Sequence, residues 1–323
     1  MYDNYISALK AEIRQMAADN TDLVFDTLFV GGGTPTSLPV SLITGVLRLC
    51  FSLFQVAPDA EVSIEANPGT VDENYLEKLL ESGVNRLSLG IQSFDDGELD
   101  ALGRLHNSAE AWAAARAAEK IGFTNINLDL MYGLPGQDAD SWQRSLTTGL
   151  SLYPSHLSLY QLTIEETTVF GDRVARGDLV LPGEDEVLLM DAVTAQLCRK
   201  ALFNRYETSN YSLEGYRCRH NINYWRNGEY HAVGAGAVSY LGGVREKRVA
   251  DPAEYIRLCL AQSPVGSERE QLTKEESFRE TVIMGLRMEE GVSREALFSR
   301  YGVDLVDCYG STLEKLLRGG FLE

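Results

Sequence analysis

The hydrophobic and polar positions in the first half of the chain form an alternating series of short apolar runs and longer amphipathic segments. The short runs are rich in Val, Leu and Ile, which is typical of buried β-strands. The longer segments carry apolar residues at helical spacing, which predicts helices. We expect strands at residues 23–30, 61–65, 85–91, 125–130 and 156–160, and helices at residues 1–20, 40–54, 72–82, 108–121 and 138–150.

Successive predicted strands are separated by roughly thirty residues, which is the size of one βα unit. This alternation predicts parallel strands joined by right-handed crossovers. In a parallel barrel, the polar residues that follow the strands would all lie at the C-terminal rim, where ligands bind. The sequence therefore predicts an α/β fold with a partial parallel (β/α) barrel, and a doubly wound open sheet is the competing architecture.

The βα pattern ends after Thr163, and the rest of the chain is more varied. The elements expected there are a loop or short hairpin at residues 169–182, helices at 184–203 and 251–262, a strand at 206–211, and helical segments at 273–287, 293–301 and 303–317. The last three resemble a winged helix without its wing. We expect a barrel core at residues 1–170, a continuation of the barrel at 171–265 and a mostly helical C-terminal module at 266–323.

Charge and composition narrow the function classes. The formal net charge is −18, which argues against nucleic-acid binding because that function needs a basic surface. The apolar runs are far shorter than a membrane span, and no secretory signal is recognisable, so we expect a cytoplasmic protein. The five cysteines are scattered singly, which fits reduced thiols and offers no local cysteine-rich metal motif.

Two of the predicted strand ends carry candidate binding residues. The first strand ends in three glycines at 31–33, followed by Thr34. Because glycine lacks a Cβ atom, such a loop lets the backbone approach a ligand closely, although a tight turn without a ligand fits equally well. Glu65 ends the second strand and could accept two ribose hydroxyls. An ordinary solvated carboxylate is the simpler interpretation of Glu65 alone.

Other polar residues extend this set. Gln92 follows the third strand and offers both a donor and an acceptor. Asp129 lies in an apolar run, where an unpaired carboxylate would cost several kcal/mol, so it needs a partner or a ligand. Arg104 is either the counter-charge of a ligand carboxylate or an ordinary surface arginine. His220 lies among Asn, Tyr and Trp residues and could bind iron, although a hydrogen-bonded histidine in an aromatic cluster explains it more simply. His231 is a weaker candidate of the same kind.

Together these stretches resemble the radical S-adenosylmethionine (SAM) superfamily, and more narrowly its oxygen-independent coproporphyrinogen III oxidase-like branch. The matching motifs are VGGGTPTSL at residues 30–38, SIEANPGT at 63–70, RLSLGIQSF at 86–94, LGRLHN at 102–107, NLDLMYGLPGQ at 127–137 and HLSLYQLTIEETT at 156–168. Within this branch, HNINYW at residues 220–225 resembles the H-N-x-x-Y-W motif of HemW-type haem chaperones.

The resemblance implies a SAM site at the rim of the barrel. Gly32, Gly33 and Thr34 would contact the amino and methionyl end of SAM. Glu65 and Asp129 would hold the ribose or neighbouring polar atoms.

The remaining roles also follow from the resemblance. Gln92 and Arg104 would complete the SAM site, with Arg104 facing the carboxylate. Thr163 would touch the adenine region. His220 would be the ligand of a haem iron. The expected function is that of a haem chaperone whose partners are haem-accepting proteins, and the chain could also form a homodimer.

One family motif is missing from this sequence. The C-x-x-x-C-x-x-C segment that binds a four-iron, four-sulfur (4Fe-4S) cluster normally precedes the opening helix, and this sequence begins at that helix. We therefore expect no cluster and no reductive cleavage of SAM by this chain, and a sequence shortened at both ends. Two alternatives stay open: an oxygen-independent coproporphyrinogen III oxidase, and a degenerate barrel that binds only a nucleoside or a protein partner.

Overall fold

The predicted parallel strands are present in the computed structural model, which describes residues 2–165 and 167–322. They are β1 (Val24–Val30), β2 (Gln55–Ala66), β3 (Arg86–Gln92), β4 (Ile126–Tyr132) and β5 (His156–Gln161). Each strand pairs in parallel with the next one along the chain. Two short antiparallel strands, β7 (Asn210–Ser212) and β6 (Asn204–Arg205), continue the sheet beyond β5.

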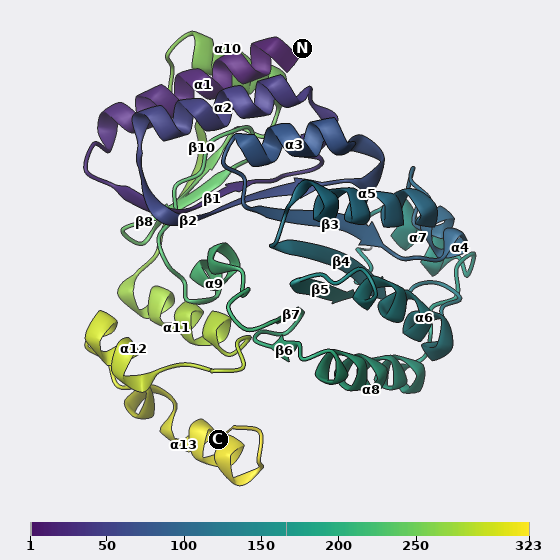
Figure 1. Ribbon diagram of the computed structural model, residues 1–323. Coiled ribbons are helices and arrows are strands. Elements are labelled where there is room, and N and C mark those ends of the chain that lie inside the picture. The colour runs from purple at the N-terminus through teal and green to yellow at the C-terminus, as the bar shows by residue number, and fades with distance from the viewer. Residues whose placement is uncertain (1, 166, 323) are drawn as a thin grey trace. The chain divides into compact units, whose positions relative to one another are not determined.

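The strand order decides between the two architectures that the sequence left open. The order is β1-β2-β3-β4-β5-β7-β6, so the parallel strands follow one another and β1 lies at an edge. A doubly wound sheet would instead place its first strand in the interior of the sheet. The sheet curls as a half-barrel (Figure 1), which confirms the predicted partial barrel.

Helix α1 precedes β1, further helices follow the strands, and helices cover one face of the sheet (Figure 1). They are α1 (Tyr2–Asp19), α2 (Val40–Leu53), α3 (Glu73–Glu81), α4 (Asp96–Ala101), α5 (Ser108–Ile121), α6 (Ala139–Leu150), α7 (Val169–Ala175) and α8 (Glu184–Lys200). The prediction of a loop or hairpin at residues 169–182 was wrong for its first half. There the Thr168 hydroxyl accepts a hydrogen bond from the Gly171 backbone N–H and begins α7.

Apolar and polar residues alternate along the strands, so one face of the sheet is apolar and the other is polar. The apolar positions of β2 to β5, such as Ile64, Leu89 and Leu128, are fully buried and pack with Leu76 and Trp142 of the helices in one hydrophobic core. Burying one such side chain contributes about 1.5–3 kcal/mol. The intervening positions are polar and point to the opposite face, because successive side chains of a strand alternate. This inner face of the half-barrel carries Glu61, Ser63, Arg86, Ser88, Asn127, Asp129, His156 and Ser158.

The described residues form two compact units, Met1–His220 and Asn221–Glu323. Helix α9 (Arg219–Trp225) spans this division, and the second unit contains β8 (Val238–Leu241), β9 (Val244–Arg248), α10 (Pro252–Leu260), β10 (Gly266–Gln271), α11 (Lys274–Gly285), α12 (Arg294–Tyr301) and α13 (Leu305–Arg318). Strands β8, β9 and β10 form an antiparallel sheet that the sequence did not predict. Every residue of β10 is exposed, so its sequence, GSEREQ, carries no apolar alternation. The three-part division at residues 170 and 265 stays a prediction.

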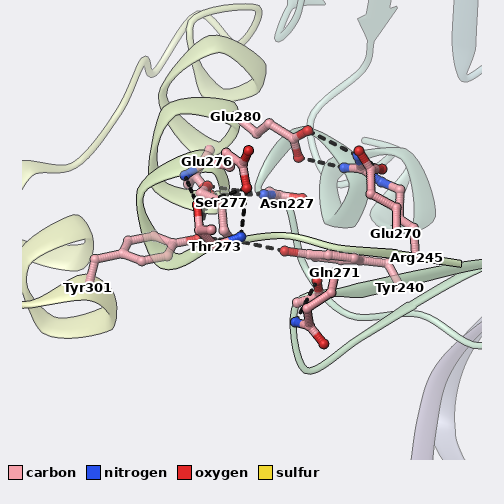
Figure 2. Close-up of polar contacts among 12 residues, drawn as sticks. Asn227, Tyr240, Arg245, Glu270, Gln271, Thr273, Glu276, Ser277, Glu280 and Tyr301 are labelled. Atoms are coloured by element: carbon pink, nitrogen blue, oxygen red, sulfur yellow. Dashed lines mark hydrogen bonds and ion pairs between the residues drawn. The ribbon is translucent and has the colours of Figure 1, made fainter.

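The C-terminal helices are joined to the second sheet by buried hydroxyl groups. Ser277 Oγ of α11 lies 3.0 Å from Tyr240 Oη of β8 and 2.9 Å from Tyr301 Oη of α12 (Figure 2). Arg245 of β9 forms an ion pair with Glu280 of α11. The predicted helical C-terminal module is therefore present.

Candidate functional site

The loop after β1 presents backbone to open space. Gly32 and Gly33 have φ values of 91° and 84°, a region that side chains other than glycine rarely adopt. A Cβ atom on either residue would meet no atom within 4 Å. Thr34, the next residue, is exposed and its side chain makes no helix-capping hydrogen bond. The loop therefore offers amide groups and a hydroxyl to a ligand.

Glu65 lies directly beside this loop. Its Oε2 atom accepts a hydrogen bond of 3.2 Å from the Gly32 backbone N–H. Burial raises the pKa of Glu65, the Gly32 N–H opposes that shift, and the Asp129 carboxylate adds to it. Two of the residues assigned to SAM are thus in direct contact, and a third is close enough to act on them electrostatically.

Asp129 of β4 is held on the inner face by neighbouring polar groups. Asn127 Nδ2 donates to its Oδ1 atom at 2.7 Å, and Ser88 Oγ donates to its Oδ2 atom at 3.2 Å. Desolvation nevertheless raises the pKa of Asp129. Arg104, in the loop between α4 and α5, is affected by the same carboxylate: desolvation lowers the pKa of Arg104, and Asp129 opposes that shift. The charge of Asp129 therefore influences the pKa values of both Glu65 and Arg104.

Gln92 ends β3 in a left-handed backbone conformation, with φ of 69°. Its amide folds back over the strand, since a Cβ atom on Gly90 would lie 3.1 Å from Gln92 Nε2 and 3.7 Å from the Ala66 carbonyl oxygen. The structure therefore places this amide near the end of β2, which Glu65 also occupies. Such backbone strain persists only where the surroundings enforce it, and it is common at binding sites.

A buried polar network that the sequence did not reveal supports this turn. Ser93 Oγ donates to Glu98 Oε2 at 2.5 Å, and Gln137 Nε2 donates to the same oxygen at 3.0 Å. Part of the signal was available, because Asp95 caps α4 and Glu98 follows it at the three-residue spacing of a helix start. Thr163 is different: it is exposed two residues after β5, and no interaction among the described residues connects it with the other candidates.

His220, at the start of α9, lies against β1. Its Nδ1 atom forms a hydrogen bond of 2.9 Å with Thr27 Oγ1, and its ring stacks on Phe29 with centroids 4.8 Å apart. The His220 backbone N–H donates to Glu61 Oε1 at 3.1 Å, and the Arg219 N–H donates to Glu61 Oε2 at 2.9 Å. Burial lowers the pKa of His220, so the imidazole is neutral at pH 7, as an iron ligand must be.

Sequence reasoning missed most of the polar inner face. His156, fully buried, is bound on both ring nitrogens: Nδ1 lies 2.6 Å from Asn127 Oδ1 and Nε2 lies 2.7 Å from Tyr206 Oη. Glu61 and Arg86 are also buried there. Polar residues at every second position of otherwise apolar strands were the available signal.

Gly31 belongs to the glycine loop and lies close to Phe29, the residue on which the His220 ring stacks. A Cβ atom on Gly31 would lie 2.3 Å from a ring carbon of Phe29 and 3.1 Å from the Glu65 carboxyl carbon. Gly31→Ala is therefore expected to lower the free energy of unfolding by about 1–3 kcal/mol, the usual cost of overpacking. Chemical denaturation measures this. Gly310→Ala in α13 is the matched control, since its Cβ would make an ordinary 3.7 Å contact. Equal stability of the two variants would contradict the close packing at Gly31.

The described residues do not fit a 4Fe-4S cluster. They contain no group of three or more His, Cys, Asp or Glu residues placed to hold a metal ion. Burial raises the pKa of Cys50 to about 11 and that of Cys198 to about 12, whereas cluster ligands are thiolates. The absence of a cluster from this chain stays a prediction.

Within the same described ranges, no helix combines the length and hydrophobicity needed to cross a bilayer.

The fold and the rim residues define the class of protein. The radical SAM superfamily model matches residues 2–148, and the HemN C-terminal domain model matches residues 272–323. The solved structure of coproporphyrinogen III oxidase (HemN) from Escherichia coli superposes with a TM-score of 0.84, covering 98% of this chain and 75% of that chain at 24% identity. This likeness shows that the two proteins share a fold.

Curated relatives narrow the class further. The chain is 35% identical over 321 residues to heme chaperone HemW of Bacillus subtilis, which covers 99% of this chain and 85% of the relative. It is 35% identical over 330 residues to heme chaperone HemW of Mycobacterium tuberculosis, covering 99% and 84%. The chain belongs to the HemW family of heme chaperones, within the radical SAM superfamily.

Proposed function

We propose that this protein is a haem chaperone that binds haem through His220, binds SAM at the barrel rim and delivers haem to acceptor proteins. The main support for the proposal is that the imidazole of His220 is neutral and is held in a fixed orientation. Thr27 and Phe29 orient its ring, and Glu61 fixes its backbone. A buried histidine held in this way is suited to bind iron, and the curated relatives are named heme chaperones.

The rim supports the SAM part of the proposal. Bound SAM would supply an adenosyl group and a positively charged sulfonium. Gly32 and Gly33 would leave room for its methionyl end, and Glu65 and Asp129 would accept hydrogen bonds from its hydroxyl and amino groups. Gln92 and Arg104 would complete the site, with Arg104 facing the carboxylate, and Thr163 is proposed to lie near the adenine.

Coproporphyrinogen III oxidation is the weaker proposal. The similarity to HemN is a similarity of fold at 24% identity, whereas the relatives matched over nearly the whole chain carry the chaperone name. We further propose a cytoplasmic location, which five cysteines that form no disulfide bond favour. A homodimer is part of the same proposal.

Haem titration followed by transfer tests the chaperone function. We expect purified protein to shift the Soret band of haem, and the shifted species to lose haem to an apoprotein of higher affinity, such as apomyoglobin. Absorbance spectra of the separated proteins measure the transfer. A protein that leaves the Soret band unchanged, or that converts coproporphyrinogen III instead, would refute the proposal.

A further inference from the structure

Arg86 is a buried cation on the inner face of the half-barrel. It begins β3, pairs in register with Ser63 of β2, and lies on the same face of its strand as Ser88. Its side chain is almost inaccessible, since the residue is 2% exposed. Among residues 2–165 and 167–322, no hydrogen bond or ion pair of its guanidinium is found, and its Nε atom is buried without a partner.

Two carboxylates on the same face, those of Glu61 and Asp129, already accept hydrogen bonds from other groups. Glu61 accepts hydrogen bonds from the backbone N–H groups of Arg219 and His220. Asp129 accepts hydrogen bonds from Asn127 and Ser88. Leaving the buried Nε donor of this guanidinium without a partner is unfavourable, so its retention points to an anion that arrives from outside the chain.

The charge of Arg86 acts on both candidate binding regions. Desolvation is the main cause of the lowered pKa of His220 and of the raised pKa of Asp129, and the charge of Arg86 adds a smaller lowering of the pKa of each group. Arg86 is therefore near enough to each region to influence a ligand bound there. Planar guanidinium groups bind carboxylates through two parallel hydrogen bonds, which gives the anion a chemical class.

We propose that Arg86 is a binding residue for a ligand carboxylate on the inner face of the half-barrel. The carboxylate has two sources within the proposed function, on which this inference rests: a propionate of haem, or the methionyl group of SAM. The haem propionate is favoured because Arg104, whose pKa Asp129 raises against desolvation, is already proposed for the carboxylate of SAM. If His220 bound the iron of a haem, Arg86 would be the residue of this face that could hold a propionate.

The test compares Arg86→Met with the parent protein in titrations with haem, with haem dimethyl ester and with SAM. Arg86→Met is expected to weaken haem binding about 10-fold or more, as the loss of a hydrogen bond to a charged group does. It should leave the affinity for haem dimethyl ester unchanged, because the ester has no carboxylate. Arg86→Lys should retain part of the haem affinity. Arg116→Met is the matched control, since Arg116 is an exposed residue that pairs with Glu119 and lies over the Trp112 ring, both on the same helix α5.

Each outcome of these titrations supports or contradicts the proposed role of Arg86. Loss of SAM binding with haem binding intact would assign the carboxylate to SAM. Unchanged affinity for both ligands would overturn the role of Arg86. A parent protein that binds no haem would defeat the proposed function instead, and the SAM titration would then decide on Arg86 by itself.

Thermal unfolding without ligand separates binding from a structural role. Removing an unpaired buried charge should leave the melting temperature of Arg86→Met equal to or above that of the parent. The stabilisation that haem gives to the parent should be reduced in this variant. A clear fall of the unliganded melting temperature would show that Arg86 stabilises the fold and would contradict the inference.

Discussion

His220→Ala is expected to abolish the Soret shift and to weaken haem binding by on the order of 100-fold or more, since even residues that only support a metal ligand contribute 10–100-fold. The physical reason is the loss of a neutral, preoriented imidazole. The hydrogen bond to Thr27 and the stacking on Phe29 fix the ring before haem arrives, so little orientational freedom is lost on binding. Spectroscopic titration measures the affinity.

His231→Ala is the matched control for this prediction, because burial also lowers the pKa of His231. We expect this variant to bind haem as the parent does. A normal Soret shift in His220→Ala would remove His220 from the haem site.

Glu65→Ala and Asp129→Ala are each expected to weaken SAM binding by about 10-fold or more, the effect of losing a hydrogen bond to a charged group. Glu65 lies near the end of β2 and Asp129 lies in β4, with β3 between these strands. Desolvation raises the pKa of Glu65, and the Asp129 carboxylate adds to the shift. Calorimetry with SAM measures the change. Glu73→Ala is the control, because Glu73 is an exposed residue that pairs with Lys120. Full SAM affinity in both rim variants would show that SAM binds elsewhere.

The same two groups give the rim a pH dependence. Desolvation raises their pKa values from 4.5 for Glu65 and 3.8 for Asp129. SAM binding needs the ionised forms, so affinity should rise with pH through the raised values. The free energy of unfolding of the unliganded protein depends on pH in the opposite direction. The contribution of these two carboxyl groups to it is complete below their pKa values in the unfolded chain, and it is lost as the pH rises through their pKa values in the folded protein. Asp129→Asn should flatten both profiles, and unchanged profiles would contradict the raised pKa of Asp129.

The half-barrel could be predicted from the sequence because its strands are strongly apolar and regularly spaced. The glycine loop, Glu65 and Asp129 were found because each follows or lies within such a strand. The sheet of β8 to β10 could not be predicted, since β10 is exposed along its whole length and has no hydrophobic pattern.

The inner face was harder to predict for a different reason. Glu61, Arg86 and His156 are far apart along the chain, and only the pairing of β2, β3, β4 and β5 brings them to one surface. The turn that follows Gln92 also involves a distant residue, because Ser93 and Gln137 both donate to Glu98 Oε2. Local propensity contains no information about such contacts.

The position of β1 at the edge of the sheet has a consequence for dynamics. This strand pairs with β2 alone, yet it carries Thr27, Phe29 and the glycine loop. Segments with fewer neighbours open first in native-state hydrogen exchange. Occupancy of either proposed site would therefore slow amide exchange in β1 more than in the interior strands, which makes this one edge a reporter for both ligands.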